Sequence, residues 1–570
     1  ISFHCNEVQG KLIGISFSSE KGKADFVPLY GKSEENIERV NLLKEIFENE
    51  NITKVVYDLK TEKHILSRYA CSIKGNCFDV QLAHYLLDSE VSHKVDFLSE
   101  KYLSYRMADG DSLTKEFAKS LQTSVLKMCK SQFSDYCSEI ADVLFQLKDI
   151  LETELKNNDL YSLFADMELP LVNVLFSMEQ NGVRIDSAEL AEFSKKLGNH
   201  KTELENQIYA LAGEKFNISS PKQLSEILFT RLQIVGDDKK KKTNTKQLST
   251  AEDVLQKLVS VHPIVPLILE YRKITKLKST YVDALPALVN PKTGRLHTSY
   301  NQAVTATGRL SSNNPNLQNI PIRTDLGKEI RKCFIPANED FVLLAADYSQ
   351  IELRIIASLS EDEHLCDAFR AGEDIHLATA AKIYGMDKSE ISKEQRANVK
   401  SVNFGIIYGI SSFGLAQQLG VSRKEASDLI EQYFESYPRV KQYIESCKQN
   451  AKEKGYAQSM CGRRRYLKDI NSLNGNLRAF AERNAVNMPV QASSADMIKL
   501  AMIGIYRRML SEGLQSKMIM QVHDELVFDV YKPELEQMRL IVKEEMVNAL
   551  KLNVPIVVEM NSGENWLVAH

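Results

Sequence analysis

The sequence predicts a multidomain protein that combines α/β and α+β architecture. A chain of 570 residues is too long for a single hydrophobic core, so several domains are expected. Residues 1–165 mix strand-like and helix-like segments, residues 166–290 follow a helical period, and the remainder places polar motifs between apolar elements. These three observations predict an α/β unit, then a helical region, then a second mixed region.

Composition is that of an ordinary folded protein. No apolar run approaches the ~20 residues needed to cross a membrane, and no signal-peptide pattern opens the chain. The nine cysteines are scattered without CxxC or zinc-like spacing, which indicates a reducing, cytoplasmic compartment. The formal net charge of −4 does not indicate nucleic-acid binding, so any basic surface that binds nucleic acid has to be local.

The first unit is expected to be built around a sheet. Strand-like alternation covers residues 11–19, 24–30 and 51–59. Residues 78–87 have the apolar pattern of a helix. Strands and helices should therefore alternate in this part of the chain.

The helical region carries clear start signals. The stretch SSPKQLSEILF offers Ser219 or Ser220 as an N-cap and Pro221 at the first helical position. A further helix is expected over ILEYRKITKLKSTY, residues 268–281.

Two basic features of this region suit a phosphate backbone. Residues 236–250, GDDKKKKTNTKQLST, form a lysine-rich loop for which a solvated tip and a phosphate-contacting tip are equally good interpretations. Arg272 and Lys276 lie four residues apart and share one helix face, which favours contact with a polyanion.

The stretch MIMQVHDELVFDV looks like two apolar strands interrupted by titratable residues. Strands at 518–522 and 526–530 would form a hairpin with Asp524 and Glu525 at its tip. Buried carboxylates are costly unless they are paired or bind a metal. The pattern alone leaves two alternatives, a turn in water and acids placed for chemistry.

A possible partner for these acids follows another apolar strand. The strand FVLLAA ends at Asp347, and a helix-like segment begins soon after. Catalytic groups are common at strand ends, although a helix-capping aspartate is the more frequent case. Together, Asp347 and Asp524 would suit two Mg²⁺ ions about 3.5–4 Å apart, with Mn²⁺ as a substitute, an arrangement that serves phosphoryl transfer.

Between these acids, SKEQRANVKSVNFGIIYG predicts a helix with a mixed stripe. Ser392 and Gln395 have the spacing of a capping box. Two cations and two aromatic residues then recur every four positions: Arg396, Lys400, Phe404 and Tyr408. The stripe favours a nucleotide, with the cations on its triphosphate and the aromatics against sugar and base. The alternative is a helix that buries its aromatic residues and solvates its charges.

Several long motifs resemble those of one family. DYSQIEL, the R-x₃-K-x₃-NFG-x₂-YG helix and QVHDELVF closely resemble motifs A, B and C of family A DNA polymerases. TATGRLSSNNPNLQNIP, AFRAGEDIH and NMPVQASSADMIK resemble further stretches of its bacterial members. The resemblance covers essentially the whole chain, which corresponds to those bacterial members without their 5′-nuclease domain. It implies a ribonuclease H-like 3′-5′ exonuclease domain joined to a right-hand polymerase with palm, fingers and thumb.

The resemblance also implies roles for individual residues. Asp347 and Asp524 correspond to the metal-binding aspartates, helped by the Tyr348 main-chain carbonyl, and Glu525 to an acidic neighbour of lesser weight. Lys400 is implied as proton donor to pyrophosphate and Glu352 as the residue that excludes ribonucleotides. The implied nucleotide contacts are Gln350, Glu352, His376, Arg396, Lys400, Phe404 and Tyr408, and the implied primer–template contacts are Arg309, Arg323, Arg483, Asn487, Gln491 and His523.

The exonuclease motifs depart from the family pattern. The opening D-x-E is missing, and the nearest stretch is HCNE. Glu62 stands where the second motif usually has Asp, and Ile140 stands where the third motif has Asp, with Asp142 two residues later. Two-metal nuclease chemistry needs clustered acids. We therefore expect a structural domain without proofreading, in which Glu62, Asp79 and Asp142 are ordinary surface acids.

The expected protein is thus a DNA-templated DNA polymerase that extends a primer with deoxynucleotides. Its expected partners are primer–template DNA and dNTPs, with no membrane, and it is expected to be a monomer in the bacterial cytoplasm, associated with the nucleoid. The expected divisions are 1–165 exonuclease-like, 166–182 palm entry, 183–290 thumb, 291–355 palm, 356–459 fingers and 460–570 palm.

Three rival functions remain distinguishable by experiment. The first is a nuclease whose N-terminal domain is active as a 3′-5′ exonuclease. The second is a nucleic-acid-binding protein without catalysis. A single-subunit RNA polymerase, the third, is disfavoured by Glu352.

Overall fold

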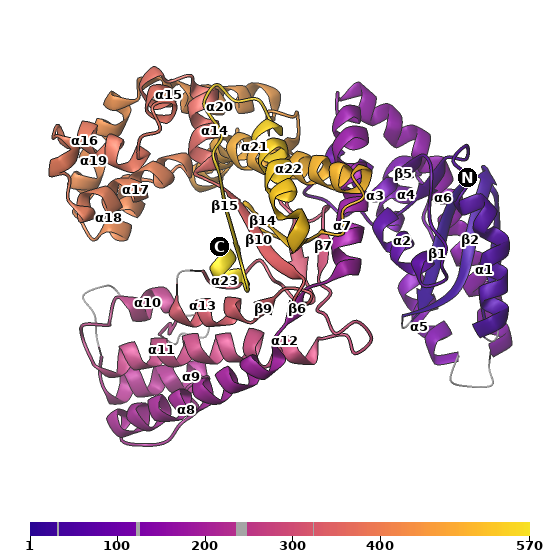
Figure 1. Cartoon of the computed structure of the whole chain (residues 1–570), viewed down its shortest axis with the longest axis horizontal. Coiled ribbons are helices and arrows are strands. Elements are labelled where there is room, and N and C mark those ends of the chain that lie inside the picture. The colour runs from indigo at the N-terminus through magenta and orange to yellow at the C-terminus, as the bar shows by residue number, and fades with distance from the viewer. Residues whose placement is uncertain (9, 31–32, 121–125, 235–247, 323) are drawn as a thin grey trace.

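The structure is a computed structural model that describes residues 1–8, 10–30, 33–120, 126–234, 248–322 and 324–570. Arg323 and most of the lysine-rich loop, residues 235–247, lie outside the described residues. No described helix is both long and apolar enough to span a membrane. Figure 1 shows the first unit at one side, a central sheet, helices α14–α20 above it and helices α8–α12 below it.

The N-terminal unit is built on a five-stranded sheet of order β3-β2-β1-β4-β5. The first three strands are antiparallel, whereas β4 and β5 run parallel to β1. The strands are β1 (Ser2–Val8), β2 (Lys11–Glu20), β3 (Lys23–Pro28), β4 (Lys54–Val56) and β5 (Cys77–Asp79). The helices are α1 (Ser33–Phe47), α2 (Leu59–Ser67), α3 (Val80–Leu87), α4 (Val95–Leu103), α5 (Gly110–Ser120) and α6 (Leu126–Asn157).

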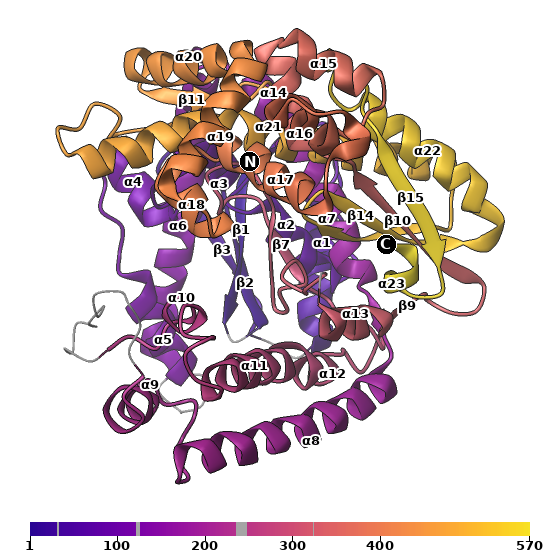
Figure 2. The same cartoon turned by 90° about the vertical axis from the view of Figure 1, so that its left-hand side faces the viewer.

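The expected strands are present in this sheet, although the strand expected over 24–30 ends at Pro28 and the one expected over 51–59 is much shorter. The strand expected over 51–59 covers only Lys54–Val56, because Asp58 caps α2 by accepting from the Thr61 backbone N–H. The helix expected over 78–87 starts at Val80, since the two residues before it belong to β5. Figure 2 shows this sheet behind the helices of the rest of the chain.

A helical region follows, and the predicted helix start is found in it. The Ser220 hydroxyl accepts from the Gln223 backbone N–H at 3.5 Å, with Pro221 at the first helical position of α9. The helix expected over 268–281 begins earlier, at Ile264, and passes into a π-helical turn after Leu277. The elements are η1 (Leu163–Glu168), α7 (Leu169–Asn181), α8 (Ser187–Ala212), α9 (Pro221–Ser225), η2 (Glu226–Arg231), α10 (Glu252–Gln256), α11 (Ile264–Leu277), η3 (Lys278–Val282) and α12 (Ala284–Ala287).

The central sheet has four antiparallel strands in the order β13-β14-β10-β15. The expected hairpin is present as β13 and β14, but Glu525 is the first residue of β14 rather than part of the tip, which is formed by His523 and Asp524. The strands are β10 (Phe341–Tyr348), β13 (Lys517–Val522), β14 (Glu525–Tyr531) and β15 (Val558–Gly563). Two-stranded ladders pair β6 (Arg184–Ile185) with β9 (Phe334–Ile335), β7 (Ser299–Asn301) with β8 (Ser311–Asn313), and β11 (Tyr456–Gln458) with β12 (Arg464–Tyr466).

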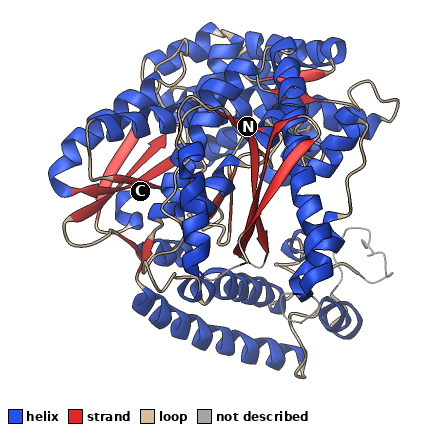
Figure 3. Cartoon of the chain, turned by 90° about the vertical axis from the view of Figure 1, so that its right-hand side faces the viewer, coloured by secondary structure: helices blue, strands red, loops and turns tan. Residues whose placement is uncertain are grey.

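Helices surround this sheet, as Figure 3 shows by colour. The capping box at Ser392 and Gln395 is present and starts α17, as predicted. The remaining elements are α13 (Asp325–Lys332), α14 (Ile351–Ser360), α15 (Glu363–Arg370), α16 (Ile375–Tyr384), η4 (Lys388–Glu390), α17 (Lys393–Ile407), α18 (Ser412–Leu419), α19 (Arg423–Ser436), α20 (Pro438–Lys454), α21 (Gly475–Ser511), η5 (Lys532–Glu534), α22 (Leu535–Asn548) and α23 (Trp566–Ala569).

The two faces of the central sheet belong to different cores, because side chains alternate along each strand. Leu344 and Phe528 join the core that runs from the N-terminal unit to α14–α20. Leu343 and Val527 point the other way and join the core of α8–α12. The sheet is therefore buried on both faces, and its strand ends are left to carry polar groups.

Candidate active site

Carboxylates gather at one end of the central sheet. Asp347, near the end of β10, is paired in register with Glu525 of β14 and Glu559 of β15. Directly opposed residues of antiparallel strands share a face, so these side chains lie on the same side of the sheet. Asp524 adjoins them in the β13–β14 turn, where its carbonyl accepts from the Tyr348 N–H at 3.3 Å. The structure thus brings together the two acids that the sequence predicts as partners.

The charges of these acids repel one another. Burial, followed by the nearby Asp524 and Glu525, raises the pKa of Asp347 to about 7. The Asp524 carboxylate accepts from the Ser494 hydroxyl at 3.1 Å. A carboxyl group that resists ionisation beside another carboxylate is a site where a hard divalent cation would relieve the repulsion.

The donor set is sparse on the protein side. Within the described ranges, no group of three or more His, Cys, Asp and Glu side chains is placed to hold a metal ion. Asp347, Asp524 and the Tyr348 carbonyl would supply the protein ligands. Mg²⁺ usually keeps waters and binds substrate phosphates in addition to one or two carboxylates, so these residues fit Mg²⁺ provided that a phosphate substrate completes the shell.

Glu525 is in a different environment from the two aspartates. It is 3% exposed, and its Oε1 accepts from Trp566 Nε1 at 3.1 Å and is 3.0 Å from His570 Nδ1. Its Oε2 lies 3.8 Å from Nη1 of Arg331, whose guanidinium is fully buried and stacks on Trp566. The hydrogen bond to Glu525 raises the pKa of His570. Glu525 is therefore held in a buried network by Trp566, His570 and Arg331, which no local sequence pattern predicts.

The stripe on α17 faces several partners. Arg396 donates from Nε and Nη2 to Oδ2 of Asp374, at 2.9 and 2.6 Å. Lys400 is exposed and has no carboxylate partner among the described residues. Phe404 is half-buried, and Tyr408, just past the helix, is 38% exposed. Lys400 is solvated, as the alternative interpretation expects, but Arg396 is paired with Asp374 and Tyr408 is not buried as that interpretation requires.

His376 lies beneath this stripe. It is 2% exposed, its Nδ1 is 3.0 Å from Asn403 Nδ2, and its ring centroid is 5.8 Å from that of Phe404. Burial, and secondly the nearby Lys400, lower the pKa of His376 to about 4, so the imidazole is neutral at pH 7. Because an amide nitrogen can only donate, Nδ1 accepts and the ring proton is on Nε2. His376 can therefore act as a neutral hydrogen-bond donor.

Glu352 links α14 to the end of α17. It is 6% exposed and accepts from Arg309 Nη2 and from the Tyr408 hydroxyl, both at 2.6 Å. Burial and this hydrogen bond raise the pKa of Tyr408. Gln350, in the left-handed backbone region with φ of 53°, is the residue before α14 and makes no side-chain capping hydrogen bond to it. The two carboxylate oxygens of Glu352 are thus both occupied in this conformation.

The predicted DNA contacts lie on α21, in the β13–β14 turn and on α11, apart from Arg309, which is bound to Glu352. One stripe on α21 consists of residues spaced by four: Arg483, Asn487 and Gln491. The side chain of Arg483 is exposed. His523 is exposed in the β13–β14 turn with φ of 56°. Arg272 and Lys276 are separate from these, on α11 below the sheet (Figure 1), where Arg272 is half-buried and donates to the Thr250 carbonyl at 2.5 Å.

In the described part of the N-terminal unit, the acids do not form a group of three or more that could hold a metal ion. Glu62 is 1% exposed and is engaged by His4 Nδ1 at 2.7 Å and by the Cys5 N–H at 3.0 Å. Asp79 is also 1% exposed, caps α3 and accepts from the Leu59 N–H at 2.7 Å. The expectation that Glu62 and Asp79 are surface acids is wrong, because backbone N–H groups hold both inside the fold. Asp142 accepts from the Gly22 N–H at 2.7 Å.

Comparison with known proteins gives consistent matches. Residues 187–568 match the family model described as DNA polymerase family A, and residues 1–156 match that described as 3′-5′ exonuclease. Several relatives are named DNA polymerase I. The one from Pseudomonas aeruginosa is 43% identical, and the match covers 99% of this chain and 62% of the relative. The one from Bacillus subtilis is 41% identical, and the match covers 97% of this chain and 62% of the relative. The chain spans about three-fifths of the length of these relatives.

A solved structure also matches almost the whole chain. It is titled POL domain of Pol1 from M. smegmatis, complex with DNA primer-template and dNTP. It is 35% identical, with a TM-score of 0.88, and the match covers 98% of this chain and 93% of that one. The predicted fold class, a ribonuclease H-like exonuclease domain with a right-hand polymerase, is confirmed by these matches.

Proposed function

The chain belongs to DNA polymerase family A, and we propose that it extends the 3′-hydroxyl of a primer with deoxynucleotides chosen by a DNA template, releasing pyrophosphate. The observation that carries the proposal is the pair Asp347 and Asp524 at one end of the central sheet, where burial, followed by the charge of Asp524, raises the pKa of Asp347. This is the charge arrangement that two-metal phosphoryl transfer needs.

Asp347, Asp524 and the Tyr348 carbonyl would hold two Mg²⁺ ions, for which Mn²⁺ could substitute. When bound, the ions activate the attacking hydroxyl and stabilise the developing negative charge. Glu525, fixed by Trp566 and Arg331, would act through the charge it adds beside Asp347 rather than as a free ligand.

The incoming nucleotide would lie along the α17 stripe. Arg396 and Lys400 would bind the triphosphate, with Lys400 positioned to donate a proton to the leaving pyrophosphate. Neutral His376 would donate from Nε2 to a phosphate oxygen. Phe404 and Tyr408 would lie against the sugar and the templating base, while Glu352 and Gln350 would contact the sugar side and exclude a 2′-hydroxyl.

Nucleotide binding then requires local rearrangement. Tyr408 is hydrogen-bonded to Glu352, and Arg396 is paired with Asp374. Both contacts have to be exchanged for contacts with the substrate, which couples closure of α17 to the correct nucleotide.

Primer–template DNA would lie across the stripe on α21 and the β13–β14 turn. Arg483, Asn487, Gln491 and His523 would contact it together with Arg309, and Arg272 and Lys276 on α11 would contact its backbone. Arg323 completes the set proposed from the sequence. Polar side chains can check pair shape at minor-groove acceptors, which every base pair presents, without reading sequence.

The proposed domain boundaries are those expected from the sequence: 1–165 exonuclease-like, 166–182 palm entry, 183–290 thumb, 291–355 palm, 356–459 fingers and 460–570 palm. We propose a monomer that works in the bacterial cytoplasm on nucleoid DNA.

Primer extension tests this proposal. A labelled primer annealed to a longer template should lengthen with dNTPs and Mg²⁺, and should not lengthen in EDTA or with ribonucleotides at matched concentration. Failure to extend with any nucleotide would contradict the proposal, and equal use of ribonucleotides would remove the role of Glu352.

The N-terminal unit is proposed to be inactive as an exonuclease. Glu62 is occupied by His4 and the Cys5 N–H, and Asp142 is bound to the Gly22 N–H, so both of these acids already have partners within the fold. The alternative, an active exonuclease, predicts shortening of 3′-labelled DNA with Mg²⁺ and no nucleotides. We expect no shortening by a preparation that extends primers normally.

A further inference from the structure

One lysine of the N-terminal unit reaches across to the polymerase region. Lys60, in the first turn of α2, is mostly buried and donates to the Glu179 carboxylate on α7 at 2.5 Å. It also donates to the main-chain carbonyl of Tyr300 in β7. Glu179 in turn accepts from the Tyr300 N–H at 2.7 Å. Lys60 and Glu179 therefore hold both polar groups of the Tyr300 backbone.

Glu179 is a fixed anion at this junction. It is buried, and its Oε2 lies 2.7 Å from Nε2 of His64, one turn after Lys60 on α2. Although burial opposes ionisation, the hydrogen bond from His64 and the charge of Lys60 lower the pKa of Glu179. Removing one partner of a buried ion pair leaves the other charge uncompensated. The arrangement around Tyr300 therefore depends on Lys60.

Tyr300 connects this junction to the central sheet. Its side chain is fully buried, and its hydroxyl accepts from the main-chain N–H of Gln521 in β13 at 3.2 Å. Gln521 is three residues before Asp524. A continuous series of hydrogen bonds thus joins α2 to the strand that leads into the carboxylate site.

Gln521 holds the turn that contains Asp524. Its side-chain amide donates to the His523 carbonyl, and its Oε1 accepts from Gln318 Nε2 at 2.8 Å. His523 has φ of 56°, in the left-handed region that residues other than glycine adopt at a cost. The turn therefore needs such contacts to keep its conformation, and Asp524 is the residue that follows.

We propose that the N-terminal unit supports polymerisation directly, and that Lys60 is a positioning residue for the turn that carries Asp524. The inference rests on the proposed polymerase function. Lys60 touches neither substrate nor Asp524 and acts through Tyr300 and Gln521. A misplacement of about 1 Å caused far from the reacting atoms can cost on the order of a hundredfold in rate. This function does not require the unit to be active as an exonuclease.

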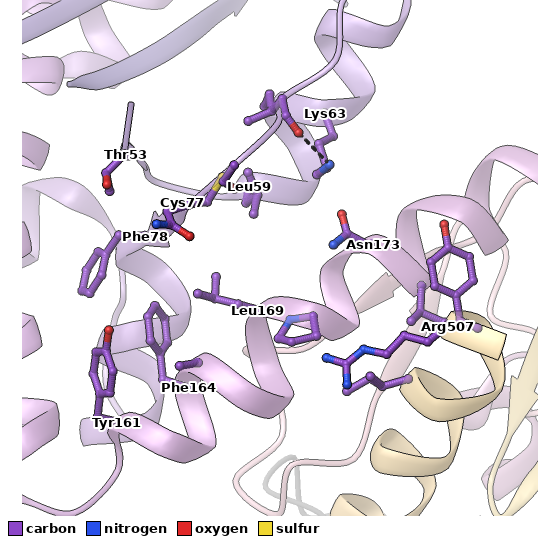
Figure 4. A pocket seen from close by; sticks show the side chains of 18 of the residues that line it. Thr53, Leu59, Lys63, Cys77, Phe78, Tyr161, Phe164, Leu169, Asn173 and Arg507 are labelled. Carbon is purple, nitrogen blue, oxygen red and sulfur yellow. Dashed lines mark hydrogen bonds between the residues drawn. The ribbon is translucent and has the colours of Figure 1, made fainter. Parts of the chain in front are cut away.

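Lys63 supplies a matched control on the same helix. It is three residues after Lys60 but lines a cavity of about 700 Å³ between α2, α7 and the last turns of α21 (Figure 4). Its ammonium donates to the Ile73 carbonyl of its own unit at 3.4 Å and makes no hydrogen bond to any described residue of the polymerase region. Lys63→Met therefore removes a lysine at the junction without touching Tyr300.

Hydrogen exchange of the full chain tests the structural part of the inference. In Lys60→Met, the peptide that contains the Gln521 N–H should exchange at least about threefold faster than in the wild-type chain. Lys63→Met should match the wild type in this peptide. Unchanged exchange in Lys60→Met, or equal acceleration in both variants, would overturn the inference. Because this measurement needs no activity, its result is independent of whether the chain is a polymerase.

Primer extension tests the functional part. Lys60→Met should lower kcat by about tenfold and raise the Mg²⁺ concentration for half-maximal rate by about threefold, because Asp524 is a proposed metal ligand. The KM for dNTP should change by less than about twofold, since the proposed triphosphate contacts lie on α17. Lys60→Arg can donate to both acceptors and should restore most of kcat. A loss of stability alone would leave the Mg²⁺ requirement unchanged, and that result would overturn the inference.

A double-mutant cycle tests whether Tyr300 carries the effect. Tyr300→Phe keeps the ring in the core but removes the oxygen that accepts from Gln521. Its kcat should fall to a similar extent, and adding Lys60→Met should lower kcat by less than about twofold more. Fully additive effects would overturn the inference. A wild-type chain that does not extend primers would refute the proposed function, whereas extension that is equally fast in Lys60→Met would refute only this inference.

Discussion

Arg396 and Asp374 form a salt bridge in which two guanidinium nitrogens donate to the same carboxylate oxygen, at 2.9 and 2.6 Å. The other oxygen of Asp374 caps α16 by accepting from the His376 and Leu377 N–H groups. The Asp374 carboxylate therefore both caps α16, which carries His376, and pairs with Arg396, the cation proposed to bind the triphosphate. In this conformation, a phosphate would have to displace Asp374 in order to bind Arg396.

Asp374→Asn should improve nucleotide binding. Asparagine keeps the cap on α16 but removes the charge that holds Arg396. Because both partners are partly exposed, we expect the KM for dNTP to fall by only about two- to fivefold, with kcat little changed. Steady-state primer extension measures both. Asp367→Asn is the matched control, since Asp367 pairs with Arg370 on the neighbouring α15. A raised KM would mean that Asp374 orients Arg396 instead of competing for it.

Asp524→Asn should abolish extension while leaving DNA binding intact. The amide cannot replace a carboxylate beside Mg²⁺, so we expect the extension rate to fall on the order of a thousandfold. The Kd for primer–template, measured by fluorescence anisotropy at fixed salt, should change by less than about twofold. This is because contacts with the DNA phosphates supply most of the binding free energy. Asp340→Asn, at an exposed position just before β10, should leave both values unchanged. An unaffected rate in Asp524→Asn would remove Asp524 from the metal site.

The sequence predicted the parts of this site that local patterns control. Alternation located β10 and the β13–β14 hairpin, and a capping box located the start of α17. The pairing of Asp347 with Asp524 followed because both lie at strand ends. The strand and capping-box predictions use residues that are close together in the chain, whereas the Asp347–Asp524 pairing joins two such local predictions.

The sequence could not predict contacts made between distant segments. Glu525 meets Trp566 and Arg331 only because α13 and α23 pack beneath the sheet. Glu62 looked like a surface acid because nothing local showed that β1 would place His4 and the Cys5 N–H against it. Asp374 was inside a recognised motif, yet its role depends on α16 packing beside α17.

Removing the charge of Glu525 should destabilise the central sheet. Arg331 is fully buried, makes no hydrogen bond to any described residue and has Glu525 as its counter-charge 3.8 Å away. Glu525→Gln removes the nearest counter-charge of this guanidinium and leaves only Asp347 nearby, which should lower the free energy of unfolding by about 3 kcal/mol. Trp566, the single tryptophan of the chain, reports directly on this region in urea titrations followed by fluorescence.

A double-mutant cycle supplies the control for that prediction. Replacing a buried ion pair by apolar or neutral groups is often close to neutral. Arg331→Met combined with Glu525→Gln should therefore unfold at higher urea than Glu525→Gln alone. Simple addition of the two single effects would show that the charges are not coupled.

Acid should loosen the N-terminal unit through His84. This residue is fully buried, with Nδ1 2.9 Å from His93 Nδ1 and Nε2 3.2 Å from Lys101 Nζ. Burial, followed by Lys101, lowers the pKa of His84 to about 3 from an ordinary value of 6.5. Between these values the unfolded chain binds a proton that the folded chain does not, so the free energy of unfolding falls as pH falls. From pH 7 to pH 5 the loss should reach at most about 2 kcal/mol.

Hydrogen exchange of α3 and α4, corrected for the intrinsic pH dependence of exchange, measures this loss locally. Protection should decrease from pH 7 to pH 5 in the wild-type chain. His84→Gln removes the titrating group and should flatten most of that change, leaving the smaller contribution of His93, whose pKa is also lowered by burial. His364→Gln, an exposed histidine on α15, should behave as wild type. Protection that is constant between the two pH values would contradict a buried neutral His84.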